Sequence, residues 1–250
     1  VWCLCFNPVG EDPNILAIGS WDQTLSFYTI DGMEAGPSKS LGFDPCALHF
    51  FESGEYLVVG GSNREAHLMT SEGVFLYTIS TEKDSWIWAT PQRPGYNCIV
   101  TGSNDGVMSM YDLTFETVCA IYRERYAYRD RMTDVIVQHL STGKKVRIKH
   151  KDYIKKISIY HNRLVVQLPD RVVIYELTQS IDPANMKYRT RDKIRKSLEC
   201  SHLVVTSMHV LMSQENKLYV LSFQGETERE YIFESSVVSI RVVGGPPERE

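Results

Sequence analysis

Residues 98–111 read CIVTGSNDGVMSMY, and two earlier stretches of the chain follow the same pattern. These are ILAIGSWDQTLSFY over residues 15–28 and YLVVGGSNREAHLM over residues 56–69. Each copy consists of an apolar run, a glycine step, a polar turn that contains Asp or Asn, and a second alternating run. The pattern therefore predicts a strand, a tight turn and a second strand in each copy.

The spacing of the copies indicates the architecture. Their central glycines, Gly19, Gly60 and Gly102, are 41 and 42 residues apart. A period of about 40 residues is typical of a β-propeller of the WD-repeat kind, in which each repeat forms one four-stranded blade. The sequence therefore predicts an all-β fold made of propeller blades, which usually serve as docking scaffolds.

The polar turns predict the local structure of each hairpin. Asp105-Gly106 is a strong two-residue hairpin signal, and we expect both residues to have positive φ. We expect Asp22 and Asp105 to accept backbone hydrogen bonds within their turns. A branched side chain at Gly102 is expected to crowd the neighbouring blade. The candidate structural residues of the blade turns are Gly19, Asp22, Gly60, Asn63, Gly102, Asp105 and Gly106.

The repeat pattern ends near Tyr122, where the charge also changes. Residues 1–120 contain 4 basic and 15 acidic residues, a balance of −11, whereas residues 121–200 contain 19 and 9, a balance of +10. The stretch RERYAYRDRMTD is charged and aromatic without a period, which predicts a linker at 123–133. We therefore expect residues 1–122 to be the last three blades of one propeller and residues 134–250 the opening blades of a second, more divergent one. A single six-bladed ring is the alternative.

Composition excludes several classes of protein. No apolar run approaches the ~20 residues that a membrane span needs, so no direct membrane span is expected. The six cysteines are scattered without a CxxC pair. This pattern favours the interpretation that the cysteines are small buried hydrophobic residues of a protein in a reducing compartment. The chain opens inside a strand-like run and stops in a turn-like one, which indicates a piece of a longer protein.

Several stretches also resemble one known family. They are RYAYRDRMTDVIVQHL (125–140), KVRIK (145–149), KKISIYHNRLVVQLPDRVVIYEL (155–177), VVGGPPERE (242–250), FDPCALHFFESGEYLVVGGS (43–62) and SWIWA (85–89). Together they are similar to the intraflagellar transport protein 122 family, and the similarity covers essentially the whole chain.

The resemblance implies two tandem propellers followed by a helical-repeat tail, with this chain at the junction of the propellers. It further implies a non-catalytic scaffold of intraflagellar transport complex A that supports retrograde ciliary transport, cilium assembly and ciliary membrane-protein trafficking. The implied partners are other complex A subunits, ciliary cargo and cargo adaptors. The implied locations are the cilium, the ciliary base (basal body) and the cytoplasm.

Signals for chemistry are weak. The sequence has no phosphate-binding glycine loop, no nucleophile elbow and no HExxH motif, and its seven histidines show no ligand spacing. We therefore expect no catalytic residue, no cofactor and no metal site. Histidines in the core or at the surface are the simpler interpretation.

The basic segment KKVRIKHK is the one pronounced electrostatic feature. Alternation in a strand places Lys145, Arg147, Lys149 and Lys151 on one face and apolar residues on the other. This pattern predicts an exposed edge strand whose charges prevent aggregation, or a candidate face for docking a partner protein. Nucleic acid is not expected, because the acidic first half would repel a polyanion and stacking aromatics are not interleaved there.

Two other functions stay open from the residues alone. The repeats would suit a generic WD-repeat adaptor of a trafficking coat or ubiquitin ligase, and the basic 123–196 segment would suit an RNA-binding module. In a scaffold, the loops 11–14, 31–40 and 80–85 are expected to supply contact surface.

Overall fold

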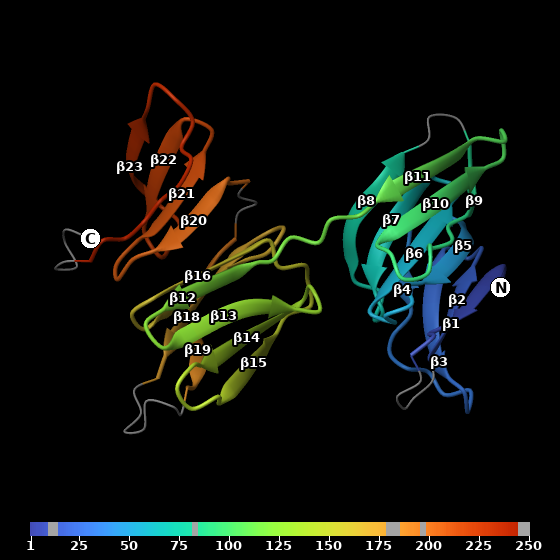
Figure 1. Cartoon of the computed structure of the whole chain (residues 1–250), viewed down its shortest axis with the longest axis horizontal. Coiled ribbons are helices and arrows are strands. Elements are labelled where there is room, and N and C mark those ends of the chain that lie inside the picture. Colours follow the sequence, from blue (N-terminus) through green and yellow to red (C-terminus); the bar gives the residue numbers. More distant parts are fainter. Residues whose placement is uncertain (10–14, 82–84, 179–185, 196–198, 245–250) are drawn as a thin grey trace. The chain divides into compact units, whose positions relative to one another are not determined.

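The computed structural model describes residues 1–9, 15–81, 85–178, 186–195 and 199–244. Every regular element in these residues is a β-strand, which confirms the predicted all-β fold of blade-like sheets. The chain divides into two compact units, Val1–Glu116 and Thr117–Glu250. Each unit contains three small antiparallel sheets, the blades, in which consecutive strands pair with each other (Figure 1).

The first unit contains the three repeats. Its first blade is β1 (Cys3–Phe6), β2 (Ile15–Ser20), β3 (Thr24–Thr29) and β4 (Lys39–Ser40). The second blade is β5 (Pro45–Phe50), β6 (Tyr56–Gly61), β7 (Glu65–Thr70) and β8 (Phe75–Thr81). The third blade is β9 (Ile87–Ala89), β10 (Cys98–Ser103) and β11 (Met108–Asp112). The quoted repeats are therefore the hairpins β2–β3, β6–β7 and β10–β11.

The second unit contains three four-stranded blades. The fourth blade of the chain is β12 (Cys119–Tyr122), β13 (Arg125–Asp130), β14 (Asp134–His139) and β15 (Lys145–Lys149). The fifth is β16 (Lys156–Tyr160), β17 (Arg163–Gln167), β18 (Val172–Leu177) and β19 (Tyr188–Ile194). The sixth is β20 (His202–Val205), β21 (Val210–Gln214), β22 (Lys217–Leu221) and β23 (Thr227–Ile232).

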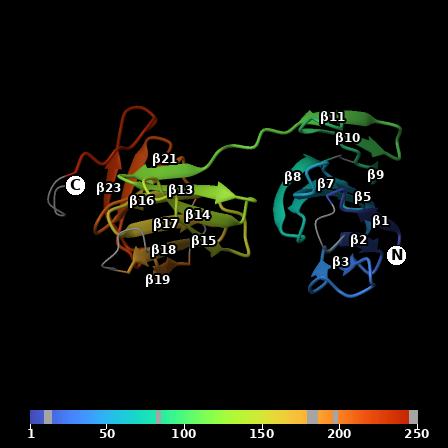
Figure 2. The same cartoon turned by 60° about the horizontal axis from the view of Figure 1, so that its bottom comes forward.

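Two expectations about the junction are wrong. Residues 123–133 are not a linker, because 125–130 form β13, which pairs along its length with β14 (Figure 2). Residues 119–122 do not complete the third blade either, because β12 pairs with β13. The charged and aromatic residues of β13 do not alternate with apolar ones in the way that predicts a strand. Within it only Ala127 is fully buried, while Arg129 donates hydrogen bonds to the Tyr153 hydroxyl and the Ile154 carbonyl.

Hydrophobic clusters lie between neighbouring blades of each unit. In the second unit, all five residues of β17 are buried. Leu164 and Val166 belong to the cluster shared with the fourth blade, and Val165 belongs to the cluster shared with the sixth. This split follows from the two-residue period of a strand, which points successive side chains to opposite faces. The fifth blade is thus the middle layer of the second unit.

Candidate docking surfaces

The three repeated turns share one hydrogen-bonding arrangement. The side-chain oxygens of Asp22, Asn63 and Asp105 each accept a bond from the backbone N–H two residues later, at 3.1, 3.4 and 3.0 Å. The residue that follows each of them has positive φ: Gln23 (66°), Arg64 (69°) and Gly106 (83°). Asp105 itself is not among the described residues with positive φ, so the expectation for both positions of that turn is wrong.

The turn type explains this difference. The N–H of Gln23 donates to the carbonyl of Ser20 at 3.0 Å, and Ser20 pairs with Thr24. A three-residue loop of this kind is a turn followed by one left-handed residue, rather than a two-residue turn with two of them. Hydroxyl groups also contribute: Thr24 lowers the pKa of Asp22, and Ser103 lowers the pKa of Asp105, each by donating a hydrogen bond to the carboxylate. The pKa of each carboxyl group is therefore below its ordinary value of 3.8.

The repeated glycines differ in how closely they are packed. A Cβ at Gly19 would lie 2.6 Å from the Cys3 sulfur and 3.0 Å from Pro45 Cγ, and a Cβ at Gly60 would lie 2.7 Å from Ile87 Cγ2. Gly102 is different, because its nearest neighbour would be Ala89 Cβ at 3.6 Å, in its own blade. The expected crowding of a neighbouring blade at Gly102 is therefore wrong. Gly19 and Gly60 each lie against the next blade of the first unit, whereas Gly102 belongs to the last blade that the structure describes in that unit.

Among the strands that the structure describes, the basic strand β15 pairs with β14 alone, so it lies at the outer edge of its sheet. Lys145, Arg147 and Lys149 are exposed, as is Lys151 just beyond the strand. Val146 and Ile148 point the other way and pack against the hydrophobic cluster between the fourth and fifth blades.

The four cations of this segment are not equivalent. Arg147 forms ion pairs with Asp134 at 2.6 Å and with Asp130 at 2.8 Å, and the hydrogen bond to Asp134 raises its pKa. The three lysines have no ion-pair partner among the described residues. Arg147 is thus occupied within its own blade, and Lys145, Lys149 and Lys151 are the cations available to a partner.

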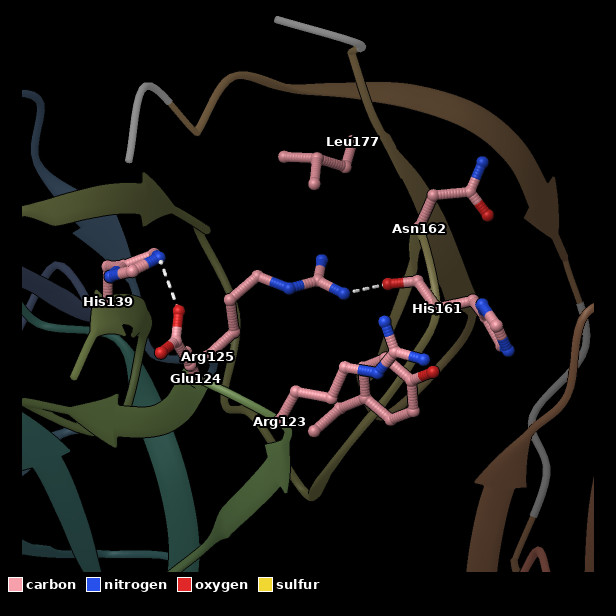
Figure 3. Close-up of a pocket in the computed structure, with 8 residues that line it drawn as sticks. Arg123, Glu124, Arg125, His139, His161, Asn162 and Leu177 are labelled. Carbon is pink, nitrogen blue, oxygen red and sulfur yellow. Dashed lines mark hydrogen bonds and ion pairs between the residues drawn. The ribbon is translucent and has the colours of Figure 1, made fainter. Parts of the chain in front are cut away.

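A pocket of about 370 Å³ lies between the fourth and fifth blades (Figure 3). It is bordered by the β12–β13 turn, by the β16–β17 turn and by the ends of β14 and β18. The lining residues are Tyr122, Arg123, Glu124, Arg125, His139, His161, Asn162 and Leu177. None of these is a serine, threonine or cysteine.

Hydrogen bonds hold most polar groups of this pocket in place. Figure 3 shows the bond that Arg125 donates to the carbonyl of His161. Arg125 also donates to the Tyr188 hydroxyl at 3.1 Å. Glu124 accepts from Ser141 at 2.7 Å and lies 3.4 Å from His139 Nε2. Arg123 extends beside the Tyr122 ring, 5.4 Å from its centroid, and has no carboxylate partner among the described residues. The sequence interpretation missed this pocket, because its arginines fell within the predicted linker.

The part of the chain that the structure describes contains neither a candidate metal site nor a candidate membrane-spanning helix. There, no group of three or more His, Cys, Asp or Glu side chains is arranged to hold a metal ion, and no helix is long and apolar enough to cross a membrane. The six cysteines are free thiols. Of the loops expected to contact partners, residues 11–14 and 82–84 lie outside the described residues.

Comparison with known proteins identifies similar chains. Residues 119–250 match the family model described as the IFT122 second beta-propeller. The whole chain is 49% identical to the intraflagellar transport protein 122 homolog of Mus musculus over 251 aligned positions, which span 21% of the mouse protein. The homolog of Homo sapiens is 49% identical over 96% of the chain and 19% of its own length. The chain thus spans about a fifth of the length of these relatives.

Among solved structures, BamB from Moraxella catarrhalis is similar over 96% of the chain, with 10% identity and a TM-score of 0.39. Values this low support no conclusion about function.

Proposed function

The chain belongs to the intraflagellar transport protein 122 family, and from this premise we propose that it is a non-catalytic scaffold segment of intraflagellar transport complex A. The observation that carries the proposal is the 49% identity to the mouse homolog over the entire chain. In this role the segment supports retrograde ciliary transport, cilium assembly and the trafficking of ciliary membrane proteins. It acts at the cilium, at the basal body and in the cytoplasm.

The two units are the end of one propeller and the beginning of the next. Two observations support this arrangement. The boundary between the two compact units falls between Glu116 and Thr117 along the chain, and the match to the second-propeller family model begins at residue 119. The junction in this proposal lies at 116–119, earlier than the sequence pattern predicts.

The proposed partners are other complex A subunits, with ciliary cargo and cargo adaptors reached through the same assembly. We assign the docking face to Lys145, Lys149 and Lys151, which lie on an exposed edge without ion-pair partners among the described residues. Their partner in this proposal is an acidic protein surface, because complementary charge steers two proteins together and orients them. A nucleic acid is disfavoured, since no aromatic side chains are interleaved with these lysines for base stacking.

The test reverses these lysines in the full-length protein, as Lys145→Glu, Lys149→Glu and Lys151→Glu together, and measures recovery of complex A subunits in co-purification. Arg147 stays unchanged, because a glutamate there would face Asp130 and Asp134. We expect about tenfold weaker association, since exposed ion pairs contribute a few tenths to 1 kcal/mol each. The wild-type association should also weaken with salt, which screens such contacts.

The matched control reverses three exposed cations in and directly beside β19, Lys187, Lys193 and Arg195, which changes the net charge equally. Unchanged recovery with the β15 variant, or equal loss with the control, would overturn the docking assignment. Loss of RNA retention without loss of subunits would instead favour the RNA-binding alternative. Failure of the wild-type protein to co-purify with any complex A subunit would overturn the scaffold proposal itself.

A further inference from the structure

All four tryptophans of the chain lie together on the first unit. Trp2 precedes β1, Trp21 is in the β2–β3 turn, Trp86 precedes β9 and Trp88 is within it. The rings of Trp2 and Trp21 stack with centroids 4.4 Å apart, and those of Trp86 and Trp88 stack at 5.8 Å. Trp2 joins the two pairs through an edge contact with Trp88 at 5.8 Å. We name this group the tryptophan cluster.

The tryptophan cluster is exposed rather than part of the core. The exposed fractions are 50% for Trp2, 49% for Trp21 and 37% for both Trp86 and Trp88. The hydrophobic core between the first two blades contains none of them. A tryptophan is usually well buried, and neighbouring exposed aromatic rings mark surfaces that bind partners. Core packing therefore does not account for this cluster.

Backbone hydrogen bonds place the cluster beside two repeated turns. The N–H of Trp2 donates to the carbonyl of Gly19 at 2.9 Å, directly before the turn that carries Trp21 and Asp22. The carbonyl of Trp86 accepts from the N–H of Asn104 at 3.2 Å, in the turn that carries Asp105. Each end of the cluster thus has an exposed aspartate in the adjoining turn.

The surrounding charge is strongly negative. The first unit contains 4 basic and 15 acidic residues, a balance of −11. Asp22 and Asp105 are exposed aspartates that carry a negative charge at neutral pH, and hydrogen bonds from hydroxyl groups lower their pKa values further. Such a field attracts cations and repels polyanions, and the face of a tryptophan ring is the best aromatic surface for a cation.

We infer that the tryptophan cluster is a binding site for arginine or lysine side chains of a basic segment in a partner protein. The cations lie on the tryptophan rings, and the carboxylates of Asp22 and Asp105 fix their charged heads at the rim. The site is built from residues of the first unit alone and binds a basic segment, whereas the lysines of β15 belong to the second unit and are proposed to bind an acidic surface.

The experiment measures binding of a labelled peptide of alternating Arg and Gly to the full-length protein by fluorescence anisotropy. A second peptide carries citrulline in place of arginine, which keeps the shape and removes the charge. We expect the citrulline peptide to bind at least about tenfold more weakly, since cation–π and carboxylate contacts both need the charge.

Two sets of variants then locate the site. Trp21→Leu with Trp86→Leu should weaken peptide binding about tenfold, whereas Tyr96→Leu, an exposed aromatic of the same unit outside the cluster, should not. Asp22→Asn with Asp105→Asn should weaken peptide binding several-fold, because both negative charges are lost. The turns themselves should be kept, since Asn63 shows that an amide can fill the same position in the turn. Protease resistance verifies that each variant is folded.

Three results would each overturn the inference. These are equal affinity for the two peptides, unchanged binding by both variant sets, and protection of the four rings from oxidative footprinting in the free full-length protein. The last result would mean that another part of the protein covers the cluster.

Discussion

The two units build the same kind of blade but hold its strands together in different ways. The first unit repeats one local device, an Asp or Asn turn that follows a glycine, and in two of the three copies this glycine is closely packed against the next blade. The second unit uses ion pairs between neighbouring strands, such as Arg163 with Glu176 across β17 and β18 and Lys217 with Glu230 across β22 and β23. A local device recurs at the same place in each blade and so leaves a period in the sequence. Pairs that are placed individually leave none, although the fold is the same.

The largest expected effect concerns an ion pair of the second unit. Replacing Glu176 by alanine should cost about 2–3 kcal/mol, because it leaves the guanidinium of Arg163, which is 9% exposed, without its counter-charge. Hydrogen exchange of the β17 and β18 amides in the full-length protein measures this loss locally. The double variant Arg163→Met with Glu176→Leu should recover most of it. If the amides of Glu176→Ala were as protected as those of the wild type, the ion pair would not stabilise the pairing of β17 and β18.

The next effect tests the glycines of the first unit. Gly60→Val should destabilise its blade by about 1–3 kcal/mol, because the side chain meets Ile87 and Thr90 of the next blade. Gly102→Val is the matched control and should change stability by less than about 0.5 kcal/mol. Hydrogen exchange of β6 and β10 compares the two. Equal losses would mean that the strand position, rather than contact between blades, demands glycine.

A smaller effect is expected from acid. The hydrogen bond from Arg163 lowers the pKa of Glu176 below its ordinary value of 4.5. A lowered carboxyl pKa adds stability that is fully present above 4.5 and is lost as the pH falls through the lower, folded-state value. Protection of β17 and β18 should therefore decline as the pH drops below about 4.5, and Glu176→Gln should flatten that decline. A decline of the same slope in the variant would assign the acid sensitivity to other groups.

The smallest effect is expected at a repeated turn. Asp105→Asn should leave the protection of β10 and β11 at neutral pH nearly unchanged, because an amide oxygen can accept the same bond from Val107. Asp105→Ala removes that acceptor and should lower protection of the same amides. If the asparagine variant lost as much amide protection as the alanine variant, the charge of Asp105 and not its hydrogen bond would stabilise the turn.

The sequence predicts the first unit well for a physical reason. Turn residues such as Asp105-Gly106 act on their own neighbours, so their pattern is visible without knowledge of the fold. The expectation that residues up to 122 belong to the third blade is wrong for β12, because alternation identifies a strand but not its pairing partner. The predicted linker contains β13, because Arg125 and Arg129 are accommodated by hydrogen bonds outside their own sheet, and Tyr126 and Tyr128 stack on each other, rather than being fully buried.

The candidate sites show the same difference between features that a local pattern predicts and features that depend on the fold. Alternation alone placed Lys145, Arg147 and Lys149 on one face, as the structure has them. It could not reveal that Arg147 is occupied by Asp130 and Asp134, since that depends on the path of β13 and β14. The tryptophan cluster joins residues 2, 21, 86 and 88, which only the assembly of three blades brings together.

The buried strand β17 has a consequence for inherited variation in proteins of this family. Its neighbouring residues Val165 and Val166 belong to different hydrophobic clusters, one shared with the sixth blade and one with the fourth. The same conservative missense change, valine to alanine, would therefore loosen a different blade contact depending on which of two adjacent codons carries it. Two such alleles, compared in one genetic background, would separate the contributions of the two contacts to a ciliary phenotype.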